Sequence, residues 1–178
     1  WGETDSYEMG EANTSEYGGD HQHKYTIKDL GANRVYYYSI DGVGEGSFRN
    51  APAAATAHTR FFAYGDTRED KEDKGQNDHD SVAARILQRI DEQPALQTVI
   101  IFSGDYVGTG RDESHWKNQF FNTDYKNLMQ LHATVPNIGA IGNHEGPGGS
   151  ELLKKYYPFP HVDKDMHYWA FNYGSVRV

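Results

Sequence analysis

The stretch Val99-Ile100-Ile101-Phe102-Ser103-Gly104-Asp105 decides the fold class of this chain. Its four consecutive apolar residues are typical of a strand that is buried on both faces, as the strands of parallel sheets are. Phe61-Phe62-Ala63-Tyr64 upstream and Asn137-Ile138-Gly139-Ala140-Ile141 downstream read as two further strands. A glycine and a polar residue follow each run: Gly65-Asp66, Gly104-Asp105 and Gly142-Asn143. The sequence therefore predicts three strands with equivalent ends.

Two helical stretches separate these predicted strands. The first is expected over Asp80–Gln93, with Asp78 or Asp80 as its N-cap. Its apolar residues recur at every fourth position: Val82, Ile86 and Ile90. The second is expected over Glu113–His132, with a break near residues 122–124. Strands that alternate with helices imply right-handed crossovers, so we expect an α/β fold in which helices flank a parallel sheet in the order βαβαβ.

The first 58 residues differ from the rest of the chain in composition and residue pattern. Residues 1–23 are acidic, contain no Lys or Arg, and have the composition of a loop. Tyr25-Thr26-Ile27 alternates as a strand does, and Val35–Ile40 is strongly β-prone. A glycine-rich turn and Ser47-Phe48-Arg49 complete a small antiparallel pattern, and residues 50–58 resemble a linker. We therefore expect two pieces: residues 1–58, a small antiparallel β piece with its linker, and residues 59–178, the α/β part.

Composition excludes several classes of function. The 178 residues carry 17 Lys+Arg and 26 Asp+Glu, which gives a formal net charge of −9. Such a chain gains nothing from a polyanion, so we expect no nucleic-acid surface. The absence of cysteine excludes disulfides, thiolate zinc sites and thiol nucleophiles. No apolar run approaches the roughly 20 residues of a membrane span, so none is expected. The composition gives no indication of oligomeric state.

The three strand ends predict a site. Ligands of open parallel sheets bind beyond the carboxyl ends of the strands, where glycine allows the backbone to turn sharply. We expect the side chains of Asp66, Asp105, Asn143 and His144 to converge there. Crowded carboxylates either share a proton or hold cations, and Asp, Asn and His are usual ligands of metal ions. A single Gly-Asp after a strand is commonly a turn or a helix cap; three such ends in succession favour a metal site.

The same residues carry a resemblance to a known family. Phe62-Ala63-Tyr64-Gly65-Asp66-Thr67-Arg68, Phe102–Gly110 and Gly142-Asn143-His144-Glu145 resemble the first three signature blocks of calcineurin-like metallophosphoesterases, in order and spacing. The similarity covers residues 59–178, which resemble the N-terminal half of that catalytic domain. Lys24–Phe48 resembles the last strands of the fibronectin type III module of purple acid phosphatases. This second resemblance implies that residues 1–58 are the C-terminal part of a fibronectin type III-like β-sandwich plus linker.

The resemblance implies a role for each matching residue. Asp66 corresponds to a ligand of a first metal ion, Asp105 to the carboxylate that bridges two ions, and Asn143 to a ligand of the second. His144 corresponds to the catalytic histidine that stabilises or protonates the leaving-group oxygen. The implied reaction is hydrolysis of a small phosphoester by a metal-bound hydroxide, with two ions of Fe, Zn or Mn. The implied location is extracytoplasmic: secreted, periplasmic or at the cell surface.

Three departures from the family pattern qualify these expectations. Arg68 stands where the family usually has a histidine; it could bind a phosphate oxygen or pair with a neighbouring acid such as Asp70. Gly108 stands where purple acid phosphatases have a metal-binding tyrosine, and Tyr106 is out of register, so no tyrosinate-to-iron colour is expected.

The third departure follows His144, where no Gly-His-x-His segment occurs; His161 and His167 do not match it. The 178 residues alone are therefore expected to bind metal poorly and not to turn over substrate. The alternative is a non-catalytic surface or ligand-binding protein on a degenerate phosphoesterase scaffold.

Other segments carry weaker signals. Glu69–Lys74 mixes charges and is expected to be a solvated loop, with a lid over the site as the alternative. Gly146–Gly149 is expected to let the backbone pass close to a substrate. Contact of His79 with the site is kept only as an alternative. The pair His21 and His23 is expected to be solvated rather than to chelate a metal.

Overall fold

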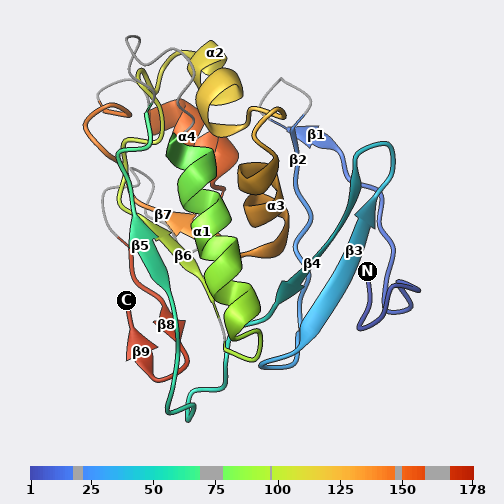
Figure 1. Ribbon diagram of the computed structural model, residues 1–178. Helices are drawn as coiled ribbons and strands as arrows, with labels where there is room; N and C mark the ends of the chain where they lie inside the picture. Colours follow the sequence, from blue (N-terminus) through green and yellow to red (C-terminus); the bar gives the residue numbers. More distant parts are fainter. Residues whose placement is uncertain (18–21, 69–77, 97, 147–149, 159–168) are drawn as a thin grey trace.

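A computed structural model describes residues 1–17, 22–68, 78–96, 98–146, 150–158 and 169–178. Several sequence predictions fall outside these ranges, namely those on His21, Glu69–Lys74, Pro147–Gly149, His161 and His167. The described part is a mixed α/β structure in which helices pack against a three-stranded parallel sheet (Figure 1).

The sheet has the order β5-β6-β7, with strands at Phe62–Tyr64, Ile100–Phe102 and Asn137–Gly139. Both pairings are parallel: Ile100 is the register partner of Phe62 on one side and of Asn137 on the other. Ile100 and Phe102 are fully buried, which explains the continuous apolar run of β6. The predicted parallel α/β sheet is confirmed, with strands one or two residues shorter than expected.

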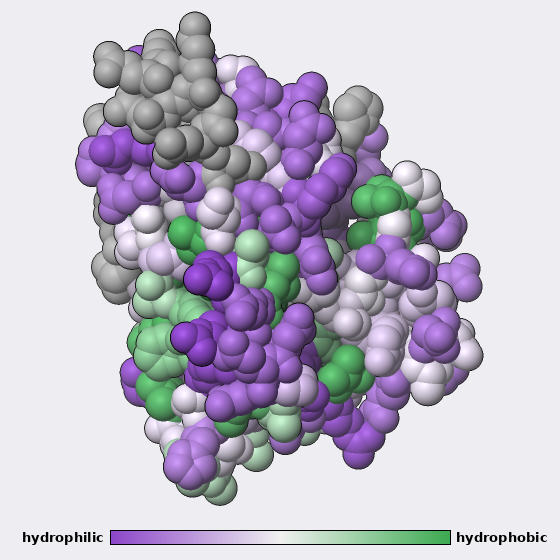
Figure 2. Space-filling model, in the orientation of Figure 1, coloured by the Kyte–Doolittle hydropathy of each residue, from purple (hydrophilic) through white to green (hydrophobic). Residues whose placement is uncertain are grey.

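Helix α1 spans Asp78–Glu92, close to the predicted Asp80–Gln93. Its buried residues are His79, Ala83 and Ile86. In the N-terminal half of the helix, the buried position is therefore Ala83 rather than the neighbouring Val82. Val82, predicted to be apolar contact surface, is 41% exposed. Hydrophilic side chains cover most of the outward face of this helix (Figure 2).

Asp80 lies in the first turn of α1 and bonds to a second helix. Its Oδ1 accepts a hydrogen bond from the backbone N–H of Leu128 at 2.8 Å, and its Oδ2 accepts one from Asn127 Nδ2 at 2.6 Å. Both donors lie in the first turn of helix α3, Lys126–Thr134. Asp80 therefore satisfies a donor at the N-terminus of a second helix, which periodicity within one segment could not indicate.

The second predicted helical stretch is broken, as expected. It comprises α2 at Glu113–His115, the π-helix η1 at Trp116–Phe120, and α3. Asp112 caps α2 by accepting a hydrogen bond from Ser114 N at 2.9 Å. At the break, Asn122 Oδ1 accepts one from Asp124 N at 3.0 Å, and this local turn replaces the helical ladder.

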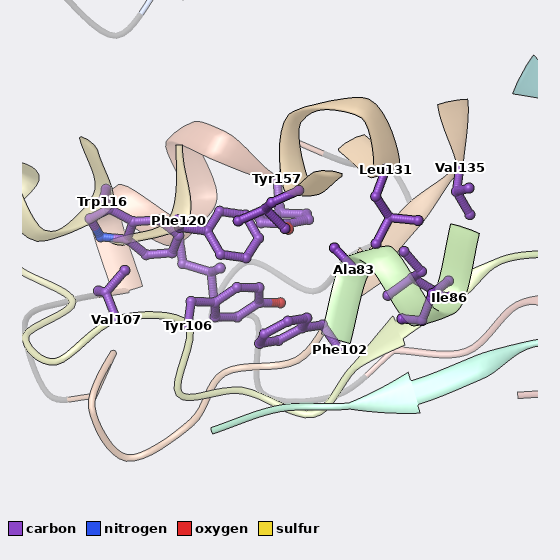
Figure 3. Packing of buried hydrophobic residues seen from close by; sticks show 13 residues of the cluster. Ala83, Ile86, Phe102, Tyr106, Val107, Trp116, Phe120, Leu131, Val135 and Tyr157 are labelled. Carbon is purple, nitrogen blue, oxygen red and sulfur yellow. The ribbon is translucent and has the colours of Figure 1, made fainter. Parts of the chain in front are cut away.

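The core between sheet and helices contains a cluster of large aromatic side chains (Figure 3). Tyr106, directly after the strand-end Asp105, stacks on Phe102 with ring centroids 4.2 Å apart. Phe120 meets both rings edge-on, and Trp116 packs beyond it. Because aromatic side chains bury large areas, they compensate for a low apolar fraction of 37%. Phe102 and Tyr106 are buried on either side of the turn that follows β6.

The N-terminal piece contains the predicted antiparallel hairpin, with β3 at Val35–Ile40 and β4 at Gly44–Arg49. It packs against α3, where Tyr38 Oη donates a hydrogen bond to Ala133 O at 2.7 Å. Two short strands, β1 at Glu16–Tyr17 and β2 at Gln22–His23, pair within the stretch expected to be loop. Tyr25-Thr26-Ile27, expected to be extended, lies outside the described strands because it has no partner strand.

The C-terminal residues form α4 at Ser150–Tyr156 and a tight antiparallel hairpin of β8, Asn172–Tyr173, and β9, Val176–Arg177. Gly174 in the turn has φ +60°, a conformation that favours glycine. Within the described ranges, no helix combines the length and the apolar character that crossing a membrane requires.

Candidate metal centre

The ends of β5 and β6 form two matching turns. Asp66 and Asp105 each have φ 56°, a left-handed backbone conformation that is uncommon outside glycine. Asp66 N donates a hydrogen bond to Gly104 O and Thr67 N donates one to Asp105 O, both at 3.1 Å. The two turns are thus held side by side, and each holds a carboxylate in a conformation that costs about 1 kcal/mol or more.

One cationic nitrogen joins the two carboxylates. Arg68 Nη1 lies 2.7 Å from Asp105 Oδ2 and 3.2 Å from Asp66 Oδ1. The side chain of Asp105 is 9% exposed, that of Arg68 39% and that of Asp66 76%. The site is therefore open on the Asp66 side and closed at Asp105, where an unpaired charge would be most costly.

The side chain of Glu145 connects the turns that follow β6 and β7. Its buried carboxylate accepts hydrogen bonds from the backbone N–H groups of Asp105, Tyr106 and Gly142 at 2.8, 3.0 and 3.1 Å. Burial raises the pKa of Glu145, and these backbone N–H groups partly oppose the rise. The sequence placed Glu145 within the third block but assigned it no role, because two of its three partners, Asp105 and Tyr106, are 40 and 39 positions away.

His144 is held at both its backbone and its ring. Its N–H donates to Asp105 Oδ1 at 3.0 Å, and its Nδ1 lies 2.8 Å from Gly108 O. Since a carbonyl oxygen only accepts, Nδ1 carries the proton, and Nε2 is the nitrogen left for other partners. The contact with Gly108 gives that glycine a backbone role in orienting the histidine.

Gly104 and Gly142 allow the turns after β6 and β7 to approach closely. Gly104 has φ +102°, and a Cβ there would lie 2.6 Å from Gly142 Cα. A Cβ on Gly142 would collide with the backbone N and the side chain of Asp105. The glycines predicted at the strand ends are therefore required by contact between two turns as well as by the sharp turns themselves.

The structure brings together most of the predicted site residues. Asp66, Arg68 and Asp105 are in direct contact, and His144 contacts Asp105 through its backbone. Asn143 lies between Gly142 and His144 on the same turn, and its side chain is exposed. Within the described ranges, no group of three or more His, Cys, Asp or Glu side chains is placed to hold a metal ion.

The donors present nevertheless fit a cation. Asp66 and Asp105 present carboxylate oxygens from adjacent strands, and Asn143 adds an amide oxygen to the neighbouring turn. Hard and borderline metal ions accept such oxygens. The guanidinium nitrogen of Arg68 acts as a stand-in ion, because two carboxylate oxygens already converge on this single cationic position.

Tyr106 and His79 lie in the core. Burial raises the pKa of the Tyr106 phenol, and the ring is fully buried against Phe102. His79 is also buried, with Nε2 3.3 Å from Tyr64 Oη, and burial lowers its pKa to about 3. Neither residue contacts the carboxylates of Asp66 and Asp105 in the hydrogen bonds and ion pairs of the described residues.

Comparison of the chain with models of protein families, with curated proteins and with solved structures finds no match.

Proposed function

We propose that this protein is a metal-dependent phosphoester hydrolase with a calcineurin-like catalytic fold. The observation that carries the proposal is the convergence of Asp66 and Asp105 on one cationic position at the carboxyl ends of parallel strands. Substrates of open parallel sheets bind at this edge. We extend the proposal to a fibronectin type III-like origin of the β3–β4 hairpin and to an extracytoplasmic location.

In this proposal Asp66, Asp105 and Asn143 would hold the metal, with up to two ions of Fe, Zn or Mn. When bound, the metal supplies a Lewis acid and an activated water at neutral pH. Asp105 is fixed for this role, since His144 N–H donates a hydrogen bond to one of its oxygens and Glu145 accepts one from its backbone N–H. A buried, doubly held carboxylate keeps its direction when a ligand enters.

His144 acts on the proton of the leaving group. Its Nδ1–H is occupied by Gly108 O, so Nε2 is the atom that holds a proton for the leaving-group oxygen. Arg68, on the open side of the site, binds non-bridging oxygens of the substrate through its planar fork. The substrate is a small phosphoester, and its negative charge is accepted because cations balance the local carboxylates.

The test is metal content and hydrolysis by the full-length protein. Purified protein is loaded with Fe, Zn or Mn and assayed with p-nitrophenyl phosphate and bis-p-nitrophenyl phosphate. Asp105→Asn preserves shape and tolerance of positive φ but removes the charge, so we expect kcat/KM to fall by about a hundredfold or more, as for loss of metal-site interactions.

Asp91→Asn is the matched control, because Asp91 lies near the end of α1, close to the opposite edge of the sheet. This variant is expected to retain full activity. Absence of bound metal together with absence of hydrolysis of both substrates in the full-length protein would defeat the proposal.

A second candidate is a non-catalytic ligand-binding protein on the same scaffold. The observation that favours it is the pairing of Arg68 with both carboxylates, which offsets one of their two negative charges without a metal. This candidate predicts that the protein binds a ligand at its surface but shows no hydrolysis with any metal. The same assays therefore separate the two functions.

A further inference from the structure

We propose that Arg68 and the metal compete for the same carboxylate oxygens, so that loading of the site displaces Arg68 and frees it to bind an anion. The inference rests on the proposed metal-dependent function and adds an order to it, with the cation bound first and the anionic substrate second. Arg68 is then both the counter-ion of the metal-free protein and an anion-binding residue of the loaded one.

Geometry makes the two occupants exclusive. Arg68 Nη1 is 2.7 Å from Asp105 Oδ2 and 3.2 Å from Asp66 Oδ1. A metal ion held by Asp66 and Asp105 would need the same two oxygens that Arg68 Nη1 now contacts. Two positive centres that share these oxygens would repel strongly, so one would have to leave.

Burial explains why the metal-free protein needs an internal cation. Asp105 is 9% exposed, and one of its oxygens, Oδ1, is held by His144 N–H. The other oxygen would carry uncompensated charge in a chain whose formal net charge is −9. Arg68 removes this penalty from a position only two residues beyond Asp66.

Arg68 can also leave without unpacking the core. Its side chain is 39% exposed, and that of Asp66 beside it is 76% exposed. The contacts that fix Asp105 come from Glu145 and His144, not from Arg68 alone. Movement of the guanidinium toward solvent therefore leaves the carboxylate in place for the incoming ion.

Once released, the guanidinium remains tethered next to the bound cation. It has five N–H donors in a planar fork that matches the oxygens of a phosphate. Binding of metal and binding of phosphate are then coupled through one side chain, and each raises the affinity for the other.

The experiment measures Mn²⁺ affinity by calorimetry on the chelator-treated full-length protein. Arg68→Gln removes the competing charge, and we expect it to bind Mn²⁺ about tenfold more tightly than the unmodified protein. With Mn²⁺ bound, the same variant is expected to bind inorganic phosphate about tenfold more weakly. Arg89→Gln is the matched control, since Arg89 pairs with Glu92 on the exposed face of α1, and it is expected to change neither affinity.

Equal or weaker Mn²⁺ binding by Arg68→Gln, with binding measurable in both proteins, overturns the inference and leaves the proposed function standing. If neither protein binds Mn²⁺, Zn²⁺ or Fe and neither hydrolyses a phosphoester, both proposals fail. Should Arg68→Gln not fold, the side-chain Nε resonance of Arg68 in the unmodified protein is followed during titration with Zn²⁺, which is diamagnetic and leaves the resonance observable. We expect this resonance to change as the ion pair breaks; an unchanged resonance at saturation overturns the inference.

Discussion

At the scale of single residues, the site depends on one carboxylate that no substrate would touch. Both oxygens of Glu145 accept backbone N–H groups, from the Asp105 turn and from the Gly142 turn. Glu145 therefore connects the turn after β6 to the turn after β7, beyond the last paired residues of these two strands. Its role is to keep Asp105 and His144 in register.

Glu145→Gln tests this connection between the two turns. The amide NH₂ of glutamine cannot accept a hydrogen bond, so at least one buried backbone N–H loses its partner. We expect a loss of about 1–3 kcal/mol in the free energy of unfolding, measured by urea denaturation at neutral pH. Glu151→Gln, on the exposed side of α4, is the control and should change stability by less than about 0.5 kcal/mol.

The residues that the sequence predicted and those it missed differ in one physical respect. Asp66, Asp105 and His144 follow apolar strands, so their position at the sheet edge was readable from local pattern. The contact of Arg68 with both aspartates depends on side-chain direction, and two of the three backbone partners of Glu145 lie on a distant turn. Neither relation leaves a trace in local composition.

At the scale of secondary-structure elements, Asp80 links α1 to α3. Periodicity located both helices and the break between η1 and α3, but it placed the buried stripe of α1 one position away from His79 and Ala83. Apolar character alone misled the assignment, since Val82 is apolar and exposed, while His79 is polar and buried among aromatic rings.

Asp80→Ala is expected to loosen the two helices from each other. It leaves Leu128 N–H and Asn127 without their acceptor, and we expect a loss of about 1–3 kcal/mol in the free energy of unfolding. Asp78→Ala removes the same charge from the same helical turn, at an exposed position. Urea denaturation of both variants separates the two effects; equal losses would show that charge at the α1 N-terminus, rather than the link to α3, matters.

At the scale of the whole molecule, two histidines make stability depend on pH. Burial lowers the pKa of His79 to about 3 and that of His132 to about 4, below the ordinary value of 6.5. The unfolded chain therefore binds more protons than the folded one between about pH 4 and pH 6.5. The stability that neutral burial provides is fully present above pH 6.5 and is lost as the pH falls.

We expect the free energy of unfolding to decrease by up to about 1.4 kcal/mol per pH unit for each histidine across this window. Chemical denaturation at a series of pH values measures the slope. His132→Leu should flatten it, whereas His58→Gln, at an exposed position, should not. An unchanged slope in His132→Leu would exclude this histidine as a cause of acid sensitivity.

The central position of β6 also has a consequence for how the chain reaches this structure. Ile100 pairs with Phe62 on one side and Asn137 on the other, so neither pairing forms between neighbours in sequence. Such pairings require closure of long loops before they gain any contact, which makes folding slow. Helices α1 and α3 can form early, but Asp66, Asp105 and His144 meet only when all three strands have joined. Assembly of the site is therefore among the last events of folding, and the apolar edges of β6 stay open to other chains until then.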